Sequence, residues 1–171
     1  MSQNCFQKRL LGVLAILLSS GIAMQSFAQG SPPPKLQAAI IMKLLPYYTN
    51  LGDGPFTIHV IGSPEVAKEL KSSWKGKAAG KATLNDITEG DSPSNGAKVI
   101  YVGSNVASAI AHTQGNQILS VTGNATFVTQ GVTLGIGVEG GKPKILLNLS
   151  SSKAEGINWN PAILKVAETI N

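Results

Sequence analysis

The sequence predicts an α/β fold, with a mostly parallel sheet flanked by helices and an antiparallel β-hairpin edge toward the C-terminal end. Strand-like and helix-like segments alternate through the middle of the chain, an order that favours parallel strands joined by crossover helices. Two of the strand-like segments end in Gly-Ser and run directly into helix-like spacing. The later segments 132–139 and 144–149 are strand-like and are separated by Gly-Gly-Lys-Pro, which is typical of a hairpin turn.

Residues 1–28 have the features of a cleavable secretory signal peptide. Lys8 and Arg9 precede an apolar run over 10–22, and Ser26-Phe27-Ala28 supplies small residues for cleavage before Gln29. An uncleaved N-terminal anchor is the alternative, but the apolar run is short for a bilayer span. We therefore expect an exported protein.

The chain after the signal peptide predicts a proline-rich linker at 29–34 and a single domain over 35–171. The only cysteine, Cys5, lies in the predicted signal peptide, so thiol catalysis, disulfides and thiolate metal sites are excluded from the mature part. Without Lys8 and Arg9 the formal net charge falls from +5 to +3, and every remaining basic residue is a lysine. Nucleic-acid-binding proteins depend on arginine, so we expect no nucleic-acid partner.

The first part of the domain predicts a helix, a strand and a second helix. Apolar residues at helical spacing predict a helix over 35–46, which Pro46 ends or kinks. A strand is expected at 56–61, where β-branched and aromatic residues lie between Gly-Pro and Gly-Ser-Pro. Ser63 has the position of an N-cap for the following helix, which begins at Pro64 and runs to about residue 73.

The middle of the domain continues this alternation. We expect a short strand at 82–84, a loop at 90–96 and a buried strand at 98–102. Ser104 is expected to cap a helix that ends near Thr113, and a further strand is expected at 118–121.

After the hairpin, the chain predicts two helical segments. The first is a short turn over 150–155. Asn160 is expected to cap a final helix that starts at Pro161. The apolar residues expected to be buried by that helix are Ile163, Leu164, Val166 and Ala167.

Two glycine-rich stretches resemble phosphate-binding motifs but lie in the wrong context. Gly135 to Gly140 matches G-x-G-x-x-G, yet that motif requires glycines between a strand and a helix, and here a second strand follows. Close packing against a neighbouring element explains Gly135 and Gly137 better. The stretch 76–81 (GKAAGK) is one residue short of the P-loop spacing, and no strand precedes it.

Side chains suited to catalysis or metal binding are sparse. His59 lies inside a predicted core strand, where a hydrogen-bonded structural role is expected, and His112 ends a helix, where the helix dipole favours it. The acids Asp86, Glu89 and Asp91 are expected in a solvated loop, with too few oxygen donors for calcium. We expect no metal, no cofactor and no catalytic residues.

Two turns could bind a small molecule. Gly62-Ser63 and Gly103-Ser104-Asn105 each join the end of a strand to a helix. Ligands bind at such ends in open parallel sheets, and backbone N–H groups there favour anions. The alternative is that both turns are ordinary helix caps.

The order of elements resembles the YfiR-like periplasmic proteins, and the resemblance spans almost all of the mature chain. Four stretches carry it: 35–45 (KLQAAIIMKLL), 55–62 (PFTIHVIG), 97–104 (AKVIYVGS), and 127–149 with its Thr-Gln-Gly, Glu-Gly-Gly and Asn-Leu signatures. The resemblance implies a Rossmann-like domain exported to the periplasm. It also implies binding to the periplasmic part of an inner-membrane diguanylate cyclase, lowered cyclic-di-GMP output and biofilm formation, and a possible homodimer.

Two departures from that family pattern bear on function. The mature chain lacks the cysteine pairs of the best-known relative, so a redox-sensing role is unsupported. It also has Pro46-Tyr47-Tyr48 where many relatives carry an aromatic F-x-x-W-P stretch, so no partner-contact residues are transferred. We expect a non-catalytic regulatory module that binds the extracytoplasmic domain of a membrane signalling protein. The alternatives are a small-ligand-binding protein serving a sensor or transporter and, more remotely, a hydrolase with an unrecognised site.

Overall fold

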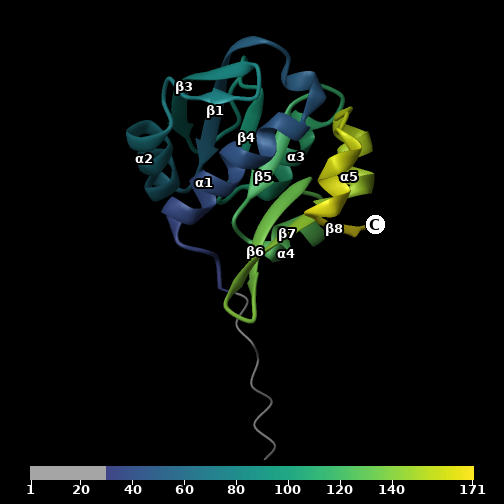
Figure 1. Ribbon diagram of the computed structural model, residues 1–171. Helices are drawn as coiled ribbons and strands as arrows, with labels where there is room; N and C mark the ends of the chain where they lie inside the picture. The colour runs from purple at the N-terminus through teal and green to yellow at the C-terminus, as the bar shows by residue number, and fades with distance from the viewer. Residues whose placement is uncertain (1–29) are drawn as a thin grey trace, which may run out of the picture.

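A computed structural model of the chain describes residues 30–171, so the predicted signal peptide lies outside the described residues (Figure 1). The described strands form one eight-stranded sheet with the order β2-β3-β1-β4-β5-β6-β7-β8. The strands are β1 (Gly54–Ile61), β2 (Ala78–Ala79), β3 (Ala82–Gly90), β4 (Val99–Val102), β5 (Leu119–Thr122), β6 (Leu134–Glu139), β7 (Lys142–Asn148) and β8 (Glu168–Ile170). The helices are α1 (Pro34–Leu44), α2 (Pro64–Ser73), α3 (Val106–Thr113), α4 (Ala125–Thr129) and α5 (Leu149–Glu155), with short 3-10 turns at Leu45–Tyr47, Thr49–Leu51 and Pro161–Lys165.

The predicted α/β fold with a mostly parallel sheet is confirmed. β1 pairs in parallel with β3 on one side and β4 on the other, and β4, β5 and β6 continue in parallel. The chain leaves β1 through α2 toward β3, and then returns to β4 on the opposite side of β1. This reversal of direction between β1 and β4 is the topological switch point of a doubly wound sheet.

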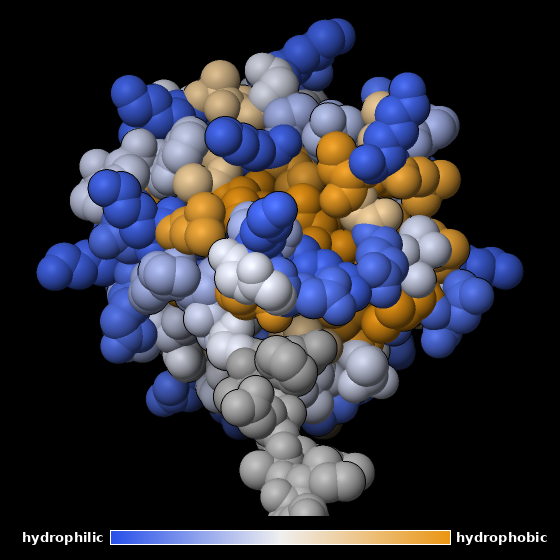
Figure 2. All heavy atoms as spheres, turned by 60° about the horizontal axis from the view of Figure 1, so that its bottom comes forward, coloured by the Kyte–Doolittle hydropathy of each residue, from blue (hydrophilic) through white to orange (hydrophobic). Residues whose placement is uncertain are grey.

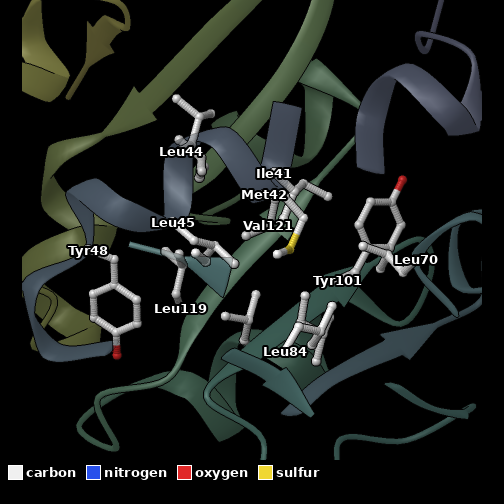
Figure 3. Close-up of a cluster of buried hydrophobic side chains, with 14 of the residues drawn as sticks. Ile41, Met42, Leu44, Leu45, Tyr48, Leu70, Leu84, Tyr101, Leu119 and Val121 are labelled. Carbon is white, nitrogen blue, oxygen red and sulfur yellow. The ribbon is translucent and has the colours of Figure 1, made fainter. Parts of the chain in front are cut away.

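Helices cover both faces of the sheet. One core packs α1 and α2 against the sheet. Figure 3 shows the side chains of Ile41 from α1 and Leu45 from the following 3-10 turn beside Leu119 and Val121 of β5. A second core lies on the opposite face, where Ala109 of α3 packs among residues of β4. All four residues of β4 are buried, which explains the continuous apolar run in its sequence.

The strand β3 differs from expectation. The sequence predicted a strand at 82–84 and acids in a loop, but β3 continues to Gly90 and carries Asp86 and Glu89. Its pairing with β1 shifts register at Phe56/Thr57, where Asn85 is the extra residue on β3. This bulge interrupts the alternation of buried and exposed residues, so the pattern of a long strand is hidden in the sequence.

The C-terminal end confirms the hairpin and corrects the final helix. β6 and β7 are antiparallel, and the turn glycines Gly140 and Gly141 have φ of 56° and 76°, as a type I′ turn requires. The segment expected as a final helix is instead the 3-10 turn Pro161–Lys165 followed by β8, which pairs in parallel with the outer side of β7. Only Ile163 of the four expected residues is buried, because hydrogen bonding to β7 extends the chain after residue 167.

Within residues 30–171, no helix has both the length and the apolar character needed to cross a membrane.

Candidate functional site

The structure brings the two predicted turns together at the switch point. Gly62 and Ser63 follow β1, and Gly103, Ser104 and Asn105 follow β4, which is the neighbouring parallel strand. The Gly103 N–H donates a 2.7 Å hydrogen bond to the carbonyl of Ile61. The five candidate residues therefore lie together at one edge of the sheet. The sequence predicted the two turns separately and did not predict that they meet.

The two turns touch so closely that they fill the crevice expected between them. A Cβ atom at Gly103 would lie 2.7 Å from the carbonyl oxygens of both Ile61 and Gly62. A Cβ at Gly62, which has φ +63°, would lie 2.1 Å from Oγ of Ser104. Glycine is therefore required at both positions to let two backbones approach, rather than to admit a ligand.

The caps at these turns correct one prediction. Ser63 is the N-cap residue of α2, but its side chain makes no capping hydrogen bond. Asn105, not Ser104, is the N-cap of α3, with a left-handed φ of 50°. Its Nδ2 donates to the carbonyl of Asp91 at 2.6 Å, which ties the loop after β3 to the start of α3. Asparagine tolerates this conformation better than serine.

A buried polar network lies between α1 and the same edge of the sheet. The Tyr101 hydroxyl donates to Oε1 of Gln37 at 2.5 Å and accepts from the Gly123 N–H at 3.2 Å. The Gln37 Nε2 donates to the carbonyl of Pro32 at 2.6 Å. Burial is the main cause that raises the pKa of Tyr101, so its phenol stays neutral and holds α1 on the sheet. Sequence reasoning missed this network because its members are far apart in the chain.

Both histidines occupy structural positions. His59 is 3% exposed, with Nδ1 2.7 Å from Oγ1 of Thr88 and Nε2 2.9 Å from the carbonyl of Ser92. Because a carbonyl only accepts, Nε2 donates to Ser92, and both ring nitrogens have hydrogen-bond partners within the fold. His112 lies in the last turn of α3, as predicted, and its buried Nε2 has no hydrogen-bond partner within residues 30–171.

The acidic side chains do not assemble a metal site. Asp86 pairs with Lys75 at 3.0 Å, and Glu89 pairs with Lys71 on the exposed side of β3. The hydrogen bond from Lys75 is the main cause that lowers the pKa of Asp86. No cluster of three or more His, Asp, Glu or Cys side chains suited to a metal ion occurs in the part of the chain that the structure describes.

Glu155 is a buried acid at the end of the segment for which the sequence predicted only a short helical turn. It is 1% exposed, and its carboxylate accepts from Oγ1 of Thr113 at 2.7 Å and from the Ser120 N–H at 3.1 Å. Burial is the main cause that raises its pKa. The acid on α5 is joined by these hydrogen bonds to α3 and β5, which indicates a structural role.

The structure explains the glycine-rich stretches by packing. A Cβ at Gly135 would lie 2.1 Å from Cγ2 of Val128, and one at Gly137 would lie 3.4 Å from Cβ of Ala125. The glycine at 135 lets the unpredicted helix α4 lie flat on β6, whereas a Cβ at Gly137 would make an ordinary contact. The stretch 76–81 forms a turn and the short edge strand β2, where the Gly76 N–H bonds to the carbonyl of Leu84, and no helix follows to bind phosphate.

Apolar and charged side chains are exposed together beside the hairpin. Pro143, Ile145 and Val166 lie in a hollow of about 370 Å³. Its rim contains Lys144, which pairs with Glu139 at 3.0 Å and Glu168 at 2.9 Å. Nearby along the chain, Leu164 is 55% exposed and Val166 is 47% exposed. Figure 2 views the molecule with the bottom of Figure 1 turned forward. On this face, apolar residues gather with hydrophilic residues around them.

Comparison with known proteins identifies one family. Residues 34–168 match the YfiR/HmsC-like family. None of the curated proteins matches the chain. Among solved structures, a conserved domain protein from Vibrio cholerae is 16% identical with a TM-score of 0.49, and an ABC domain in complex with L-Trp from Streptococcus pneumoniae is 14% identical with a TM-score of 0.53. Each match covers 81% of this chain, which spans 60% and 62% of the length of those proteins.

Proposed function

The chain belongs to the YfiR/HmsC-like family, and we propose that it is a non-catalytic periplasmic regulator that binds and restrains the extracytoplasmic domain of an inner-membrane signalling protein. A diguanylate cyclase is the favoured partner, with lowered cyclic-di-GMP and less biofilm as the consequence. The family match carries this proposal, because it covers the domain from the start of α1 to the start of β8.

The state of the polar side chains supports binding rather than catalysis. His59 uses both ring nitrogens within the fold, Tyr101 is buried under α1, and Glu155 is sealed between α3 and α5. A nucleophile or general base has to reach a substrate, and these groups reach only other groups of the domain. The N-terminal features over 1–28 support export to the periplasm.

The exposed apolar side chains beside the hairpin support binding to a protein partner. Exposed apolar side chains that lie together and are rimmed by charges are typical of interaction sites. Pro143 lies on the part of β7 that β8 does not cover, and proline has no N–H to offer to an added strand. We therefore expect a partner to contact Val166 in the hollow beside the hairpin and the exposed Leu164, which precedes it by two residues in the chain.

The proposal is tested in cells and with the purified domain. Deletion of the gene should raise cyclic-di-GMP and biofilm, and the full-length chain should restore both. The double variant Leu164→Ser, Val166→Ser should fail to restore them, whereas Leu149→Ser, an exposed apolar change on α5, should restore them. Pull-down with the purified protein should recover an inner-membrane signalling protein. Unchanged cyclic-di-GMP after deletion, together with recovery of outer-membrane contaminants only, would refute the proposal.

A small-ligand-binding protein is the second candidate, because the two turns lie at the switch point, where ligands bind in open parallel sheets, although their contact fills the crevice in this structure. The backbone contact between Gly62 and Gly103 has to open before a ligand can enter. A ligand that binds only the folded state raises the melting temperature, so thermal shift against a panel of metabolites tests this function. A flat response across the panel would remove it.

A homodimer is compatible with either function. Light scattering of the purified protein over a range of concentrations would establish the subunit number.

A further inference from the structure

The turn between β3 and β4 contains the only Asn-Gly dipeptide of the chain, Asn95-Gly96. Both residues are exposed. Gly96 has φ +88°, and a Cβ built there would meet nothing within 4 Å. Among the described residues, no neighbouring group therefore covers this side of the turn. Without a side chain on Gly96, its nitrogen can approach the neighbouring side chain with little steric hindrance.

The side chain of Asn95 is also unrestrained by hydrogen bonds in the described part of the chain; the only bond to this residue there runs from the Ser94 hydroxyl to its backbone carbonyl, at 3.4 Å. Within residues 30–171, its side-chain amide has no partner, and the Gly96 N–H donates to no acceptor. Other asparagine side chains are held by the fold: the amides of Asn105, Asn116 and Asn148 donate to carbonyls, and Asn50, Asn124 and Asn160 accept from backbone N–H groups. Asn95 therefore combines freedom of its side chain with a glycine neighbour.

We propose that Asn95 is a site of spontaneous deamidation. The nitrogen of Gly96 attacks Cγ of Asn95, a new C–N bond closes a five-membered succinimide, and the side-chain nitrogen leaves as ammonia. Water then opens the ring at either carbonyl, which leaves aspartate or isoaspartate at position 95. The net reaction consumes one water and releases one ammonia, and it requires no oxidant, reductant or enzyme.

The product would place a new negative charge in a basic hollow. Asn95 and Gly96 line a cavity of about 300 Å³ together with Lys98 and His112, and no acidic residue lines it. A carboxylate at position 95 can pair with the Lys98 ammonium. The isoaspartate form also adds a backbone methylene to the turn between β3 and β4, a few residues before the buried strand β4. The modification would thus produce a form of the protein that differs in charge and that accumulates with age.

Peptide mapping by mass spectrometry tests the site. The folded, purified protein is incubated in mildly alkaline buffer and digested at intervals. We expect Asn95 to convert at least about tenfold faster than Asn85 or Asn116, because neither is followed by glycine. Asn95→Gln should suppress the acidic form on ion exchange, since closure of the larger ring is slower, and Asn95→Asp should elute with it. The same digest of urea-unfolded protein measures the rate without the fold.

Two results would overturn the proposal. The first is that Asn95 converts rapidly in the unfolded protein but, in the folded protein, no faster than Asn85 or Asn116. This result would show that the fold protects the turn. The other is an acidic form that persists unchanged in Asn95→Gln, which would place the reaction elsewhere.

Discussion

Replacement of Gly135 by alanine should destabilise the domain through one contact. The new Cβ would lie 2.1 Å from Cγ2 of Val128, about 1.3 Å less than the 3.4 Å at which ordinary contact begins. Val128 is fully buried, so its side chain has no open space into which to turn, and α4 has to move away from β6. Overpacking of this kind costs about 1–3 kcal/mol of unfolding free energy. The melting temperature should fall by roughly 3–4 °C for each kcal/mol in a domain of this length.

Gly137 provides a matched control on the same strand and the same face. A Cβ there would lie 3.4 Å from Ala125, which is ordinary contact, so Gly137→Ala should change stability by less than about 0.5 kcal/mol. Urea unfolding followed by circular dichroism measures both variants. Val128→Ala creates a cavity in the wild type, but it should restore much of the stability lost in Gly135→Ala, because the two side chains would share one space. Equal effects of the two glycine substitutions, or additive effects of Gly135→Ala and Val128→Ala, would refute the packing explanation.

Three further predictions concern the buried network, the switch point and the buried acid. Tyr101→Phe leaves the Gly123 N–H and Gln37 Oε1 without their shared partner, so urea unfolding should show a loss of about 1–3 kcal/mol; a neutral result would show that water replaces the hydroxyl. Gly103→Ala should lose at least about 2 kcal/mol, since its Cβ meets two backbone carbonyls that cannot rotate away, and a near-native melting curve would contradict the close approach. The pKa of Glu155 is higher in the folded than in the unfolded state, so the folded state binds the proton more tightly and stability should fall as pH rises from about 4.5 through that higher pKa. Glu155→Gln, whose amide can donate to Thr113 while its oxygen accepts from Ser120, should lack this part of the pH dependence; an unchanged profile would assign it to another group.

The candidate site shows how far sequence alone reaches. The Gly-Ser turns after 56–61 and 98–102 were predicted because each follows a strand and precedes a helix, which is a local pattern. Their mutual contact was not predictable, because Gly62 and Gly103 are distant in the chain and meet only when β1 and β4 pair. The residues around Gln37 in the sequence do not indicate its hydrogen bond to Tyr101. Glu155 likewise has the sequence context of a surface acid, and only the packing of α3 and β5 around it makes it buried.

The sequence by itself determined those elements that a local pattern of residues indicates. The strand β4 (Val99–Val102) is apolar throughout because both of its faces are covered, the hairpin turn requires glycines with positive φ, and Asn160 caps the turn that follows it. Tertiary structure decided the bulged course of β3, the short helix α4 and the conversion of the expected last helix into a 3-10 turn and β8. The physical reason is that periodicity records which side of a segment meets the core, whereas strand pairing and close backbone approach depend on groups that only the folded chain brings within hydrogen-bonding distance.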